Sequence, residues 1–163
     1  MRPFSLTAFS GPEDWYRHYA CNYPKFFKMD LLSKWAWVAA EMLLRPVDEA
    51  PLYEGIDPTR IAVIMASTHG CLDTDHRYLK STETIPSPAL FVYTLPNIML
   101  GEICIRHGFK GEQLCLIQEA FDADALRAYA ASLLMSPHTD ACLYGYANAC
   151  NGSATATFYW VTR

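Results

Sequence analysis

Residues Ser87 to Leu126 read SPALFVYTLPNIMLGEICIRHGFKGEQLCLIQEAFDADAL and contain the clearest element boundaries in the chain. Apolar residues recur at helical spacing up to Gly108, run without interruption over 114–117, and return to helical spacing afterwards. Glycine is a common residue just after a helix, and Asp122 or Asp124 can cap the next one. The stretch therefore predicts a helix over 96–107, a buried strand over 114–117 and a helix over 122–134.

Other segments have the patterns of an α/β domain. Leu31 to Leu44 is apolar on nearly every side of a helix, with Asp30 as its candidate N-cap. Residues 61–66, IAVIMA, form a short continuous apolar run, which is typical of a parallel strand covered on both faces. The C-terminal segment predicts a hairpin, with strands over 141–147 and 154–162 joined by Asn151-Gly152.

The N-terminal part and the middle of the chain are less regular. We expect a first strand over 3–9, and a short helix with a packed aromatic loop over 13–28. From Ser67 to Thr94 no period holds, which predicts a long loop of the kind that is usually functional or mobile. Together these segments predict a single α/β domain over 1–163, with parallel strands covered by helices.

The composition narrows the class of protein. Hydrophobic residues make up 52% of the chain and aromatic residues 13%, which indicates either a dense core or a large apolar face for a partner. A net charge of −4 without blocks of like charge does not support nucleic-acid binding. The N-terminus has no signal-peptide pattern, and no apolar run approaches the roughly 20 residues of a membrane span. We therefore expect a cytoplasmic protein.

Cysteines and histidines give no metal or redox motif. The six cysteines have no CxxC spacing and several lie in apolar patterns, which predicts reduced thiols. The segment THGCLDTDH, residues 68–76, holds two histidines close to acidic residues and a cysteine. Its spacing fits no zinc pattern, so we favour a solvated or interface loop over a metal site. The prediction is a protein without metal or cofactor.

Two segments resemble a known family, the β-ketoacyl synthases. SPALFVYTLPNIMLGEICIRHGFKG, residues 87–111, is similar to the family segment that precedes the strand delivering the nucleophilic cysteine. KFFKMDLLSKWAWVAAEMLL, residues 25–44, resembles another ketosynthase segment. The resemblance covers most of the chain, but only the N-terminal half of a ketosynthase.

The resemblance implies one half of a thiolase-like fold. The five predicted strands, numbered along the chain, would form a mixed sheet in the order 3-2-1-4-5, with strand 5 antiparallel and helices on both faces. In that order the strand over 114–117 lies at a sheet edge. A bare apolar edge promotes unwanted association, and family dimers cover it by pairing the strand with its counterpart in the other subunit.

The chain departs from the family where the chemistry belongs. A ketosynthase needs a cysteine thiolate, and its second half supplies two histidines. Aligned on Asp124-Ala125-Leu126, the chain has Glu119 at the position of the nucleophile, and Cys115 comes four residues early. A carboxylate is a poor nucleophile toward a thioester. We therefore expect no condensation by this chain alone and assign no catalytic residue.

Glu119 has three interpretations. Gln118-Glu119 resembles the pattern of chain-length factors, the inactive partners of ketosynthases, in which a Gln stands at or beside this position. As such a remnant, Glu119 would pack or hydrogen-bond near the subunit interface. It can instead cap the following helix, the interpretation that we favour. In the third, a buried Glu119 with a raised pKa acts as an acid or base.

The resemblance also implies interface or tunnel residues. In ketosynthase dimers the segment that matches 91–99 lies at the two-fold axis and reaches the partner's acyl tunnel, where bulky side chains can stop chain growth sterically. Ordinary core or interface packing is the alternative. The candidates are Phe91, Tyr93, Leu95, Asn97, Met99, Leu114, Leu116 and Gln118.

The leading prediction is a non-catalytic, chain-length-factor-like subunit. It would pair with a full ketosynthase in type II polyketide or fatty-acid-like biosynthesis, for example of aryl polyenes, and shape the acyl tunnel of that partner. One alternative is an independent homodimer that binds acyl chains or acyl carrier protein. Another is a small acyl-thioester enzyme that uses Glu119.

Overall fold

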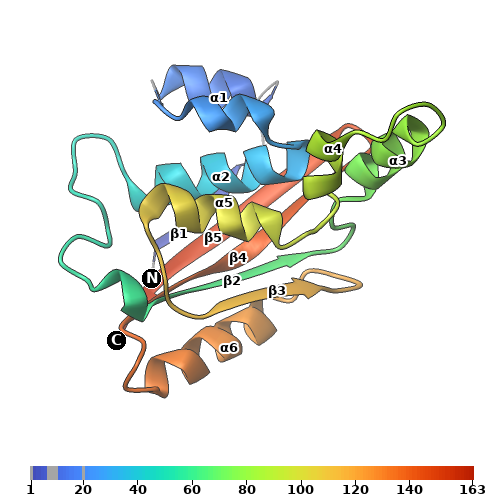
Figure 1. Ribbon diagram of the computed structural model, residues 1–163. Helices are drawn as coiled ribbons and strands as arrows, with labels where there is room; N and C mark the ends of the chain where they lie inside the picture. The colour runs from blue at the N-terminus through green and yellow to red at the C-terminus, as the bar shows by residue number, and fades with distance from the viewer. Residues whose placement is uncertain (1, 7–10, 20) are drawn as a thin grey trace.

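The computed structural model describes residues 2–6, 11–19 and 21–163, the first of these ranges by its backbone alone (Figure 1). A mixed sheet has α2 (Leu31–Leu44) and α5 (Ile98–His107) on one face and α6 (Ala123–Met135) on the other. The strands are β1 (Arg2–Leu6), β2 (Ile61–Ser67), β3 (Gln113–Ile117), β4 (Ala141–Cys150) and β5 (Ser153–Thr162). Further helices are α1 (Pro12–His18), α3 (Leu72–Ser81) and α4 (Pro88–Val92), with short 3₁₀ helices at Pro24–Lys28 and Pro58–Arg60.

The strands are arranged in the order β1-β5-β4-β2-β3. β2 pairs in parallel with β3 on one side and with β4 on the other, and β5 is antiparallel to both β4 and β1. The edge position of β3 and the antiparallel direction of the last strand are confirmed. The expected order 3-2-1-4-5 is wrong, because it placed the first strand between β2 and β4. β1 instead lies at the opposite edge of the sheet, beside β5.

Local geometry explains this order. Asn151 and Gly152 have φ angles of 51° and 76°, the left-handed conformations of a two-residue hairpin turn. The turn holds β5 beside β4, and β2, which is buried along its whole length, needs a neighbour on each side. Hydrophobic periodicity identifies strands but does not say which strands are neighbours. The order expected from the resemblance therefore had no independent support in the sequence.

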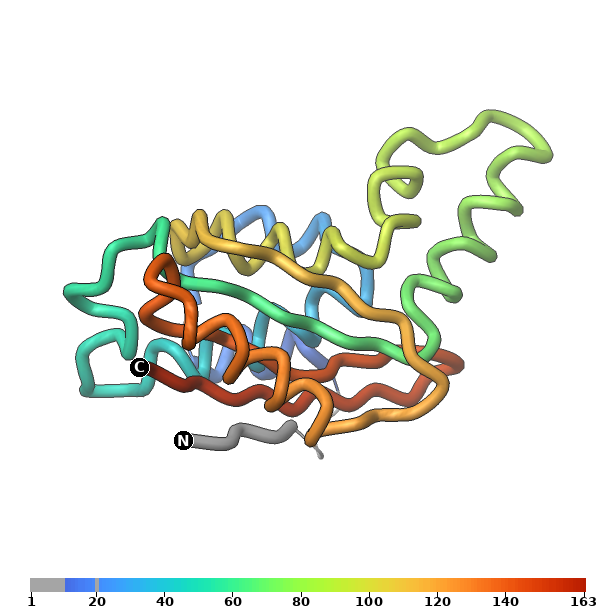
Figure 2. Tube along the Cα trace, turned by 90° about the horizontal axis from the view of Figure 1, so that it is seen from below, coloured from blue at the N-terminus to red at the C-terminus, as the bar shows by residue number. Residues whose placement is uncertain are grey.

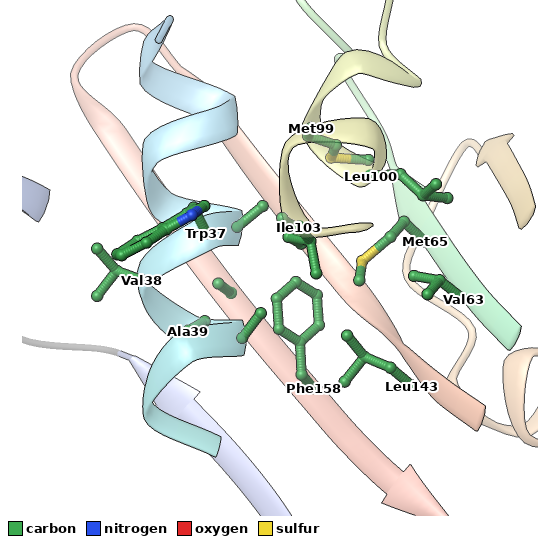
Figure 3. Packing of buried hydrophobic residues seen from close by; sticks show 14 of the residues in the cluster. Trp37, Val38, Ala39, Val63, Met65, Met99, Leu100, Ile103, Leu143 and Phe158 are labelled. Atoms are coloured by element: carbon green, nitrogen blue, oxygen red, sulfur yellow. The ribbon is translucent and has the colours of Figure 1, made fainter. Parts of the chain in front are cut away.

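The larger core lies between the sheet and the layer of α2 and α5. Figure 3 shows Ile103 of α5 beside Phe158 of β5 and Met65 of β2, with α2 packed next to them. Burial of each such side chain contributes about 1.5–3 kcal/mol relative to exposure. The prediction that α2 is buried on several sides is confirmed, because α1 packs against it from outside the layer. Fully or almost fully buried members include Trp37, Val38, Ala39, Met99, Leu100 and Ile103.

A smaller core lies under α6 on the other face. Leu126 and Ala130 are buried there, packed with Ile64 and Tyr144 of the sheet. Tyr129 was expected to point inward with them, and this is wrong, since 49% of the residue is exposed. Tyr129 instead lines the groove between α6 and β3, on the side of the helix that faces the sheet edge.

The helix boundaries follow local capping chemistry. Ser33 N donates to the Asp30 carboxylate over 3.0 Å, which confirms Asp30 as the N-cap of α2. Gly108 ends α5 with a φ of 75°, the left-handed conformation that glycine adopts without strain. The expected strand over 3–9 is described only in part, because residues 7–10 lie outside the described residues.

The expected long loop contains two helices, α3 and α4. They form an arm, residues 68–95, that projects from the body of the molecule (Figure 2). The loop prediction is wrong because the α3 sequence LDTDHRYLKS is polar on most of its sides and lacks a core-facing apolar stripe. Contacts hold its first turn: Thr74 Oγ1 donates to Asp30 over 3.2 Å, and Asn151 N donates to Asp73 over 3.1 Å.

Candidate partner-binding edge and the carboxyl end of the sheet

One edge of the sheet is formed by β3, and its outward backbone groups follow from its pairing with β2. Val63 N donates to Glu112 O over 2.8 Å, and Gln118 N donates to Ser67 O over 3.0 Å. In a parallel ladder alternate residues bond to the same neighbour. The backbone N–H and C=O groups of Gln113, Cys115 and Ile117 therefore point away from β2, and no described strand lies beyond them.

The side chains of β3 alternate between the two faces of the sheet. Leu114 and Leu116 are half-buried on the α6 face, and Cys115 is half-buried on the α5 face. The expectation of a buried strand over 114–117 holds only in part, because residues 114–116 are half-buried and Ile117 keeps 56% of its surface. A missing neighbour beyond the edge explains this partial burial.

A shallow groove lies on each side of the edge. On the α5 side, a cavity of about 400 Å³ is lined mainly by apolar groups, including Gly101, Cys104 and Ile105. On the α6 side, a cavity of about 200 Å³ lies between β3 and Tyr129. The edge therefore presents unpaired backbone groups flanked by apolar surface on both faces.

The arm begins close to the carboxyl end of β3. A Cβ atom on Gly70, at the base of the arm, would lie 3.4 Å from Ile117 Cδ1 and 3.2 Å from Pro96 Cγ. Several large apolar residues of the arm are exposed, so apolar surface is present on both the arm and the neighbouring edge. They are Leu79, Ile85, Phe91, Val92 and Leu95.

The tunnel candidates of the segment 91–99 divide into two groups. Phe91 and Leu95 keep 54% and 53% of their surface exposed, and Asn97 is exposed as well. Tyr93 and Met99 are buried, so they belong to the core of this chain. The Tyr93 hydroxyl donates to Glu102 over 3.1 Å, and burial together with that carboxylate raises the pKa of Tyr93.

Glu119 lies exposed in the segment between β3 and α6. It does not cap α6, since the Asp122 side chain accepts from Ala125 N over 2.9 Å and fills that role. The favoured interpretation of Glu119 is therefore wrong, and so is the premise of a buried acid or base. Gln118 is half-buried, and its Oε1 atom has no hydrogen-bond partner among the described residues.

A polar network that was not predicted from the sequence lies at the carboxyl ends of β2 and β4. Asn148 Oδ1 accepts from Ser67 Oγ over 3.1 Å and from His69 N over 3.0 Å, which orients its Nδ2 toward His69 Nδ1, 3.0 Å away. Thr68 Oγ1 lies 2.9 Å from His69 Nδ1 and 2.8 Å from the Tyr146 hydroxyl. The sequence contains one indication of this network. Polar residues directly follow the buried strand β2, at the end of the sheet where α/β proteins bind ligands.

The thiols lack the surroundings of a nucleophile. All six cysteines are free. Burial raises the pKa of Cys115, and burial followed by the Asp75 carboxylate raises the pKa of Cys71 to about 12. A catalytic thiol needs a lowered pKa, which a neighbouring cation or a base supplies. Neither thiol has such an environment.

The histidines and acidic residues form no metal centre in the described part of the chain, where no group of three or more potential ligands is placed to hold an ion. In the segment 68–76, His69 bonds within the polar network and Asp73 bonds to the β4–β5 turn. Burial lowers the pKa of His107 to about 4, and its Nδ1 lies 3.2 Å from the Tyr53 hydroxyl, which indicates a packing role.

Among the described helices, none is long and apolar enough to span a membrane.

A β1-β5-β4-β2-β3 sheet between helical layers, with β5 antiparallel, is one half of a thiolase-like fold. One match is a chain from the complex of a ketosynthase with its chain length factor from Xenorhabdus doucetiae. It has a TM-score of 0.73 and 13% identity, over 100% of this chain and 77% of that chain. The ishigamide ketosynthase/chain length factor matches with a TM-score of 0.71 and 21% identity, over 83% of this chain and 44% of that one.

A β-ketoacyl synthase from Burkholderia phymatum STM815 matches with a TM-score of 0.64 and 17% identity, over 97% of this chain and 47% of that chain. This chain thus spans about half the length of several ketosynthase chains that it matches. No family model and no curated protein matches the sequence. The comparisons establish a ketosynthase-like fold.

Proposed function

We propose that this chain is a non-catalytic, chain-length-factor-like subunit that pairs with a full ketosynthase in type II polyketide or fatty-acid-like biosynthesis, including the aryl-polyene kind. Its β3 edge completes a sheet with the partner, and its arm contacts the partner near the acyl tunnel. The observation that carries the proposal is the unpaired β3 edge, flanked by apolar grooves and adjacent to the arm.

The β3 edge supports strand pairing on physical grounds. Unpaired N–H and C=O groups at Gln113, Cys115 and Ile117 can form main-chain hydrogen bonds to an antiparallel strand of a partner. The grooves beside them give the flanking side chains of the partner apolar surface to bury. In the isolated chain the backbone groups have no strand partner and the grooves leave apolar surface in water, and both favour association.

The chemistry of the chain supports a silent role. Glu119 is exposed and accepts no hydrogen bond from the described residues that would make it a positioned base, and a carboxylate would store an acyl group only as a reactive anhydride. The raised pKa of Cys115 argues against a thiolate at neutral pH. The exposed side chains of Phe91 and Leu95 are then available to contact the acyl tunnel of a partner.

A homodimer is the second candidate, and the β3 sequence favours it. A two-fold axis through Cys115 would place Gln113 opposite Ile117 of the other copy and Leu114 opposite its Leu116. Every cross-strand pair in this register is free of like charges. In this form the protein would bind acyl chains or acyl carrier protein without a ketosynthase.

Light scattering separates the two candidates. The mass is measured for the chain alone and with the ketosynthase encoded nearest to it, and a one-to-one complex is expected. Cys115→Pro removes an outward N–H that β2 does not use, so it should weaken the complex at least tenfold, whereas Cys115→Ser should retain it. A stable homodimer that does not bind the ketosynthase would refute the partner-subunit role and favour the second candidate.

A further inference from the structure

A polar cavity of about 320 Å³ lies away from the β3 edge, between the segment that follows α1, the carboxyl end of α2, and α5. Its polar lining includes Asn22, Glu41, Arg45 and Arg106, and Met42 and Val47 contribute apolar surface. This volume is at the lower end of the range for small-molecule sites, which combine apolar walls with a few converging polar groups. The pairing role proposed above does not use it.

The guanidinium of Arg106 is held in a fixed orientation. Its Nε donates to Glu41 over 2.9 Å and its Nη2 donates to the other carboxylate oxygen, which makes a bidentate pair. The rings of Tyr23 and Trp37 lie 5.5 and 5.6 Å from its central carbon. Nη1 makes only a 3.5 Å contact with Asn22 O, so this nitrogen keeps donor capacity.

The charged groups of the cavity are not balanced. Glu41 is the single carboxylate in the lining, and Arg45 Nε lies 3.7 Å from its Oε1 atom, the same oxygen that accepts from Arg106 Nη2. His107 is neutral at pH 7, because burial lowers its pKa to about 4. The lining therefore has two guanidinium groups and one carboxylate, an excess of one positive charge.

The ends of the neighbouring helices do not remove this excess. A helix carboxyl end carries about half an elementary charge, and its effect is confined to the last turn. Some last-turn carbonyls of the two helices are already engaged: Arg45 N donates to Glu41 O and Leu52 N to Leu44 O, both over 2.9 Å, and Phe109 N donates to Cys104 O over 3.0 Å. A bound anion would meet the free donors of Arg45 and Arg106 more directly than these carbonyl groups.

We propose that this cavity binds a small organic oxyanion, a carboxylate or a phosphate monoester with a compact apolar group. The anionic end would accept hydrogen bonds from Arg106 Nη1 and from Arg45, whose side chain is 47% exposed and free to turn toward it. The apolar group would lie against Met42 and Val47.

Isothermal titration calorimetry tests the proposal with benzoate and phenyl phosphate as probes and benzamide as the uncharged counterpart. Saturable binding of at least one anion and none of benzamide are expected, and the tighter anion identifies the headgroup. Arg45→Ala should weaken binding about tenfold or more, because it removes a charged donor from an exposed position without disturbing the core. Val47→Trp, which fills the cavity without changing its charge, should weaken binding as well.

Arg17→Ala is the matched control. Arg17 is exposed on α1 and pairs with Asp14 over 3.2 Å, and it does not line the cavity, so its loss should leave binding unchanged. The proposal is overturned if neither anion binds saturably, if benzamide binds equally well, or if Arg17→Ala weakens binding as much as Arg45→Ala. All of these titrations use the chain alone, so their results are independent of pairing with a ketosynthase.

Discussion

The Tyr93 hydroxyl donates a hydrogen bond to Oε1 of Glu102, 3.1 Å away, and both residues are buried. Glu102 also lies 2.9 Å from Lys25 Nζ, so a carboxylate inside the protein is compensated by one hydroxyl and one ammonium group. Glu102 therefore joins Tyr93, at the end of α4, to Lys25 in the N-terminal part of the chain. This contact gives Tyr93 a structural role in the core that the exposed Phe91 does not share, although the two residues were predicted to have the same role.

Tyr93→Phe and Phe91→Ala should have different effects on stability. Loss of the Tyr93 hydroxyl leaves the buried Glu102 with one partner fewer, so the free energy of unfolding should fall by about 1–3 kcal/mol. Phe91 is 54% exposed, and Tyr78 is the one aromatic ring that it contacts among the described residues, so its truncation should cost less than about 1 kcal/mol. Urea unfolding measures both values. Equal losses would contradict the division between core and surface.

His107 makes the stability depend on pH. Burial lowers its pKa to about 4, below the value near 6.5 of the unfolded chain. Between these values the unfolded state binds more protons, so stability rises with pH, is fully present above about 6.5, and is lost as the pH falls toward 4. The loss should be about 3 kcal/mol. Unfolding at pH 7 and pH 4 measures it, and His107→Gln should remove most of this difference.

Glu119 and Asp122 provide a matched pair of acidic residues next to α6. Asp122→Ala should lower the free energy of unfolding by about 1 kcal/mol, because Ala125 N loses the side chain that caps the helix. Glu119→Gln should change stability by less than about 0.5 kcal/mol, since Glu119 is exposed. Any hydrolysis of acyl thioesters should be unchanged in Glu119→Gln. A loss of such activity would instead support the enzyme alternative.

The sequence was sufficient for the elements with strong local signals. The caps at Asp30 and Gly108, the buried run of β2 and the Asn151-Gly152 turn each depend on residues close together in the chain, and each was predicted within a few residues. The prediction of the strand order failed, because the order depends on contacts between segments that are distant in the sequence. The helices of the arm were not predicted, because α3 stands away from the core and its sequence is mostly polar, with few apolar residues to mark a buried face.

The candidate site was predictable in part for the same reason. The edge position of β3 was correct, although the full sheet order was not. The prediction that Glu119 caps α6 was wrong. Glu119 and Asp122 both lie near the start of this helix, and only the backbone geometry shows that Asp122 is the cap. The network of Ser67, His69 and Asn148 joins residues 79 and 81 positions apart, so a local pattern could point to the polar residues after β2 but not to their partner Asn148.

Oxidative cross-linking tests the homodimer. In a two-fold pair centred on Cys115, the two Cα atoms would be about 5.5 Å apart, the separation of a hydrogen-bonded antiparallel pair. This lies within the range that a disulfide spans. Copper-phenanthroline should therefore give a covalent dimer of the chain alone if it pairs with itself. Cys115→Ser should abolish the product and Cys104→Ser, a change of a buried thiol, should retain it; dimer formation independent of Cys115 would contradict this register.

Phe91 tests the contact between the arm and the acyl tunnel. If its exposed ring forms part of the tunnel wall, Phe91→Ala enlarges the tunnel, and the reconstituted ketosynthase complex should make products at least one extension unit longer. Mass spectrometry of the carrier-bound products measures the length. Met135→Ala is the control, because Met135 is 84% exposed but lies on α6, across the sheet from α5. If the complex still assembles through the β3 edge but the product lengths are unchanged, Phe91 does not line the tunnel. The arm would then serve only for docking.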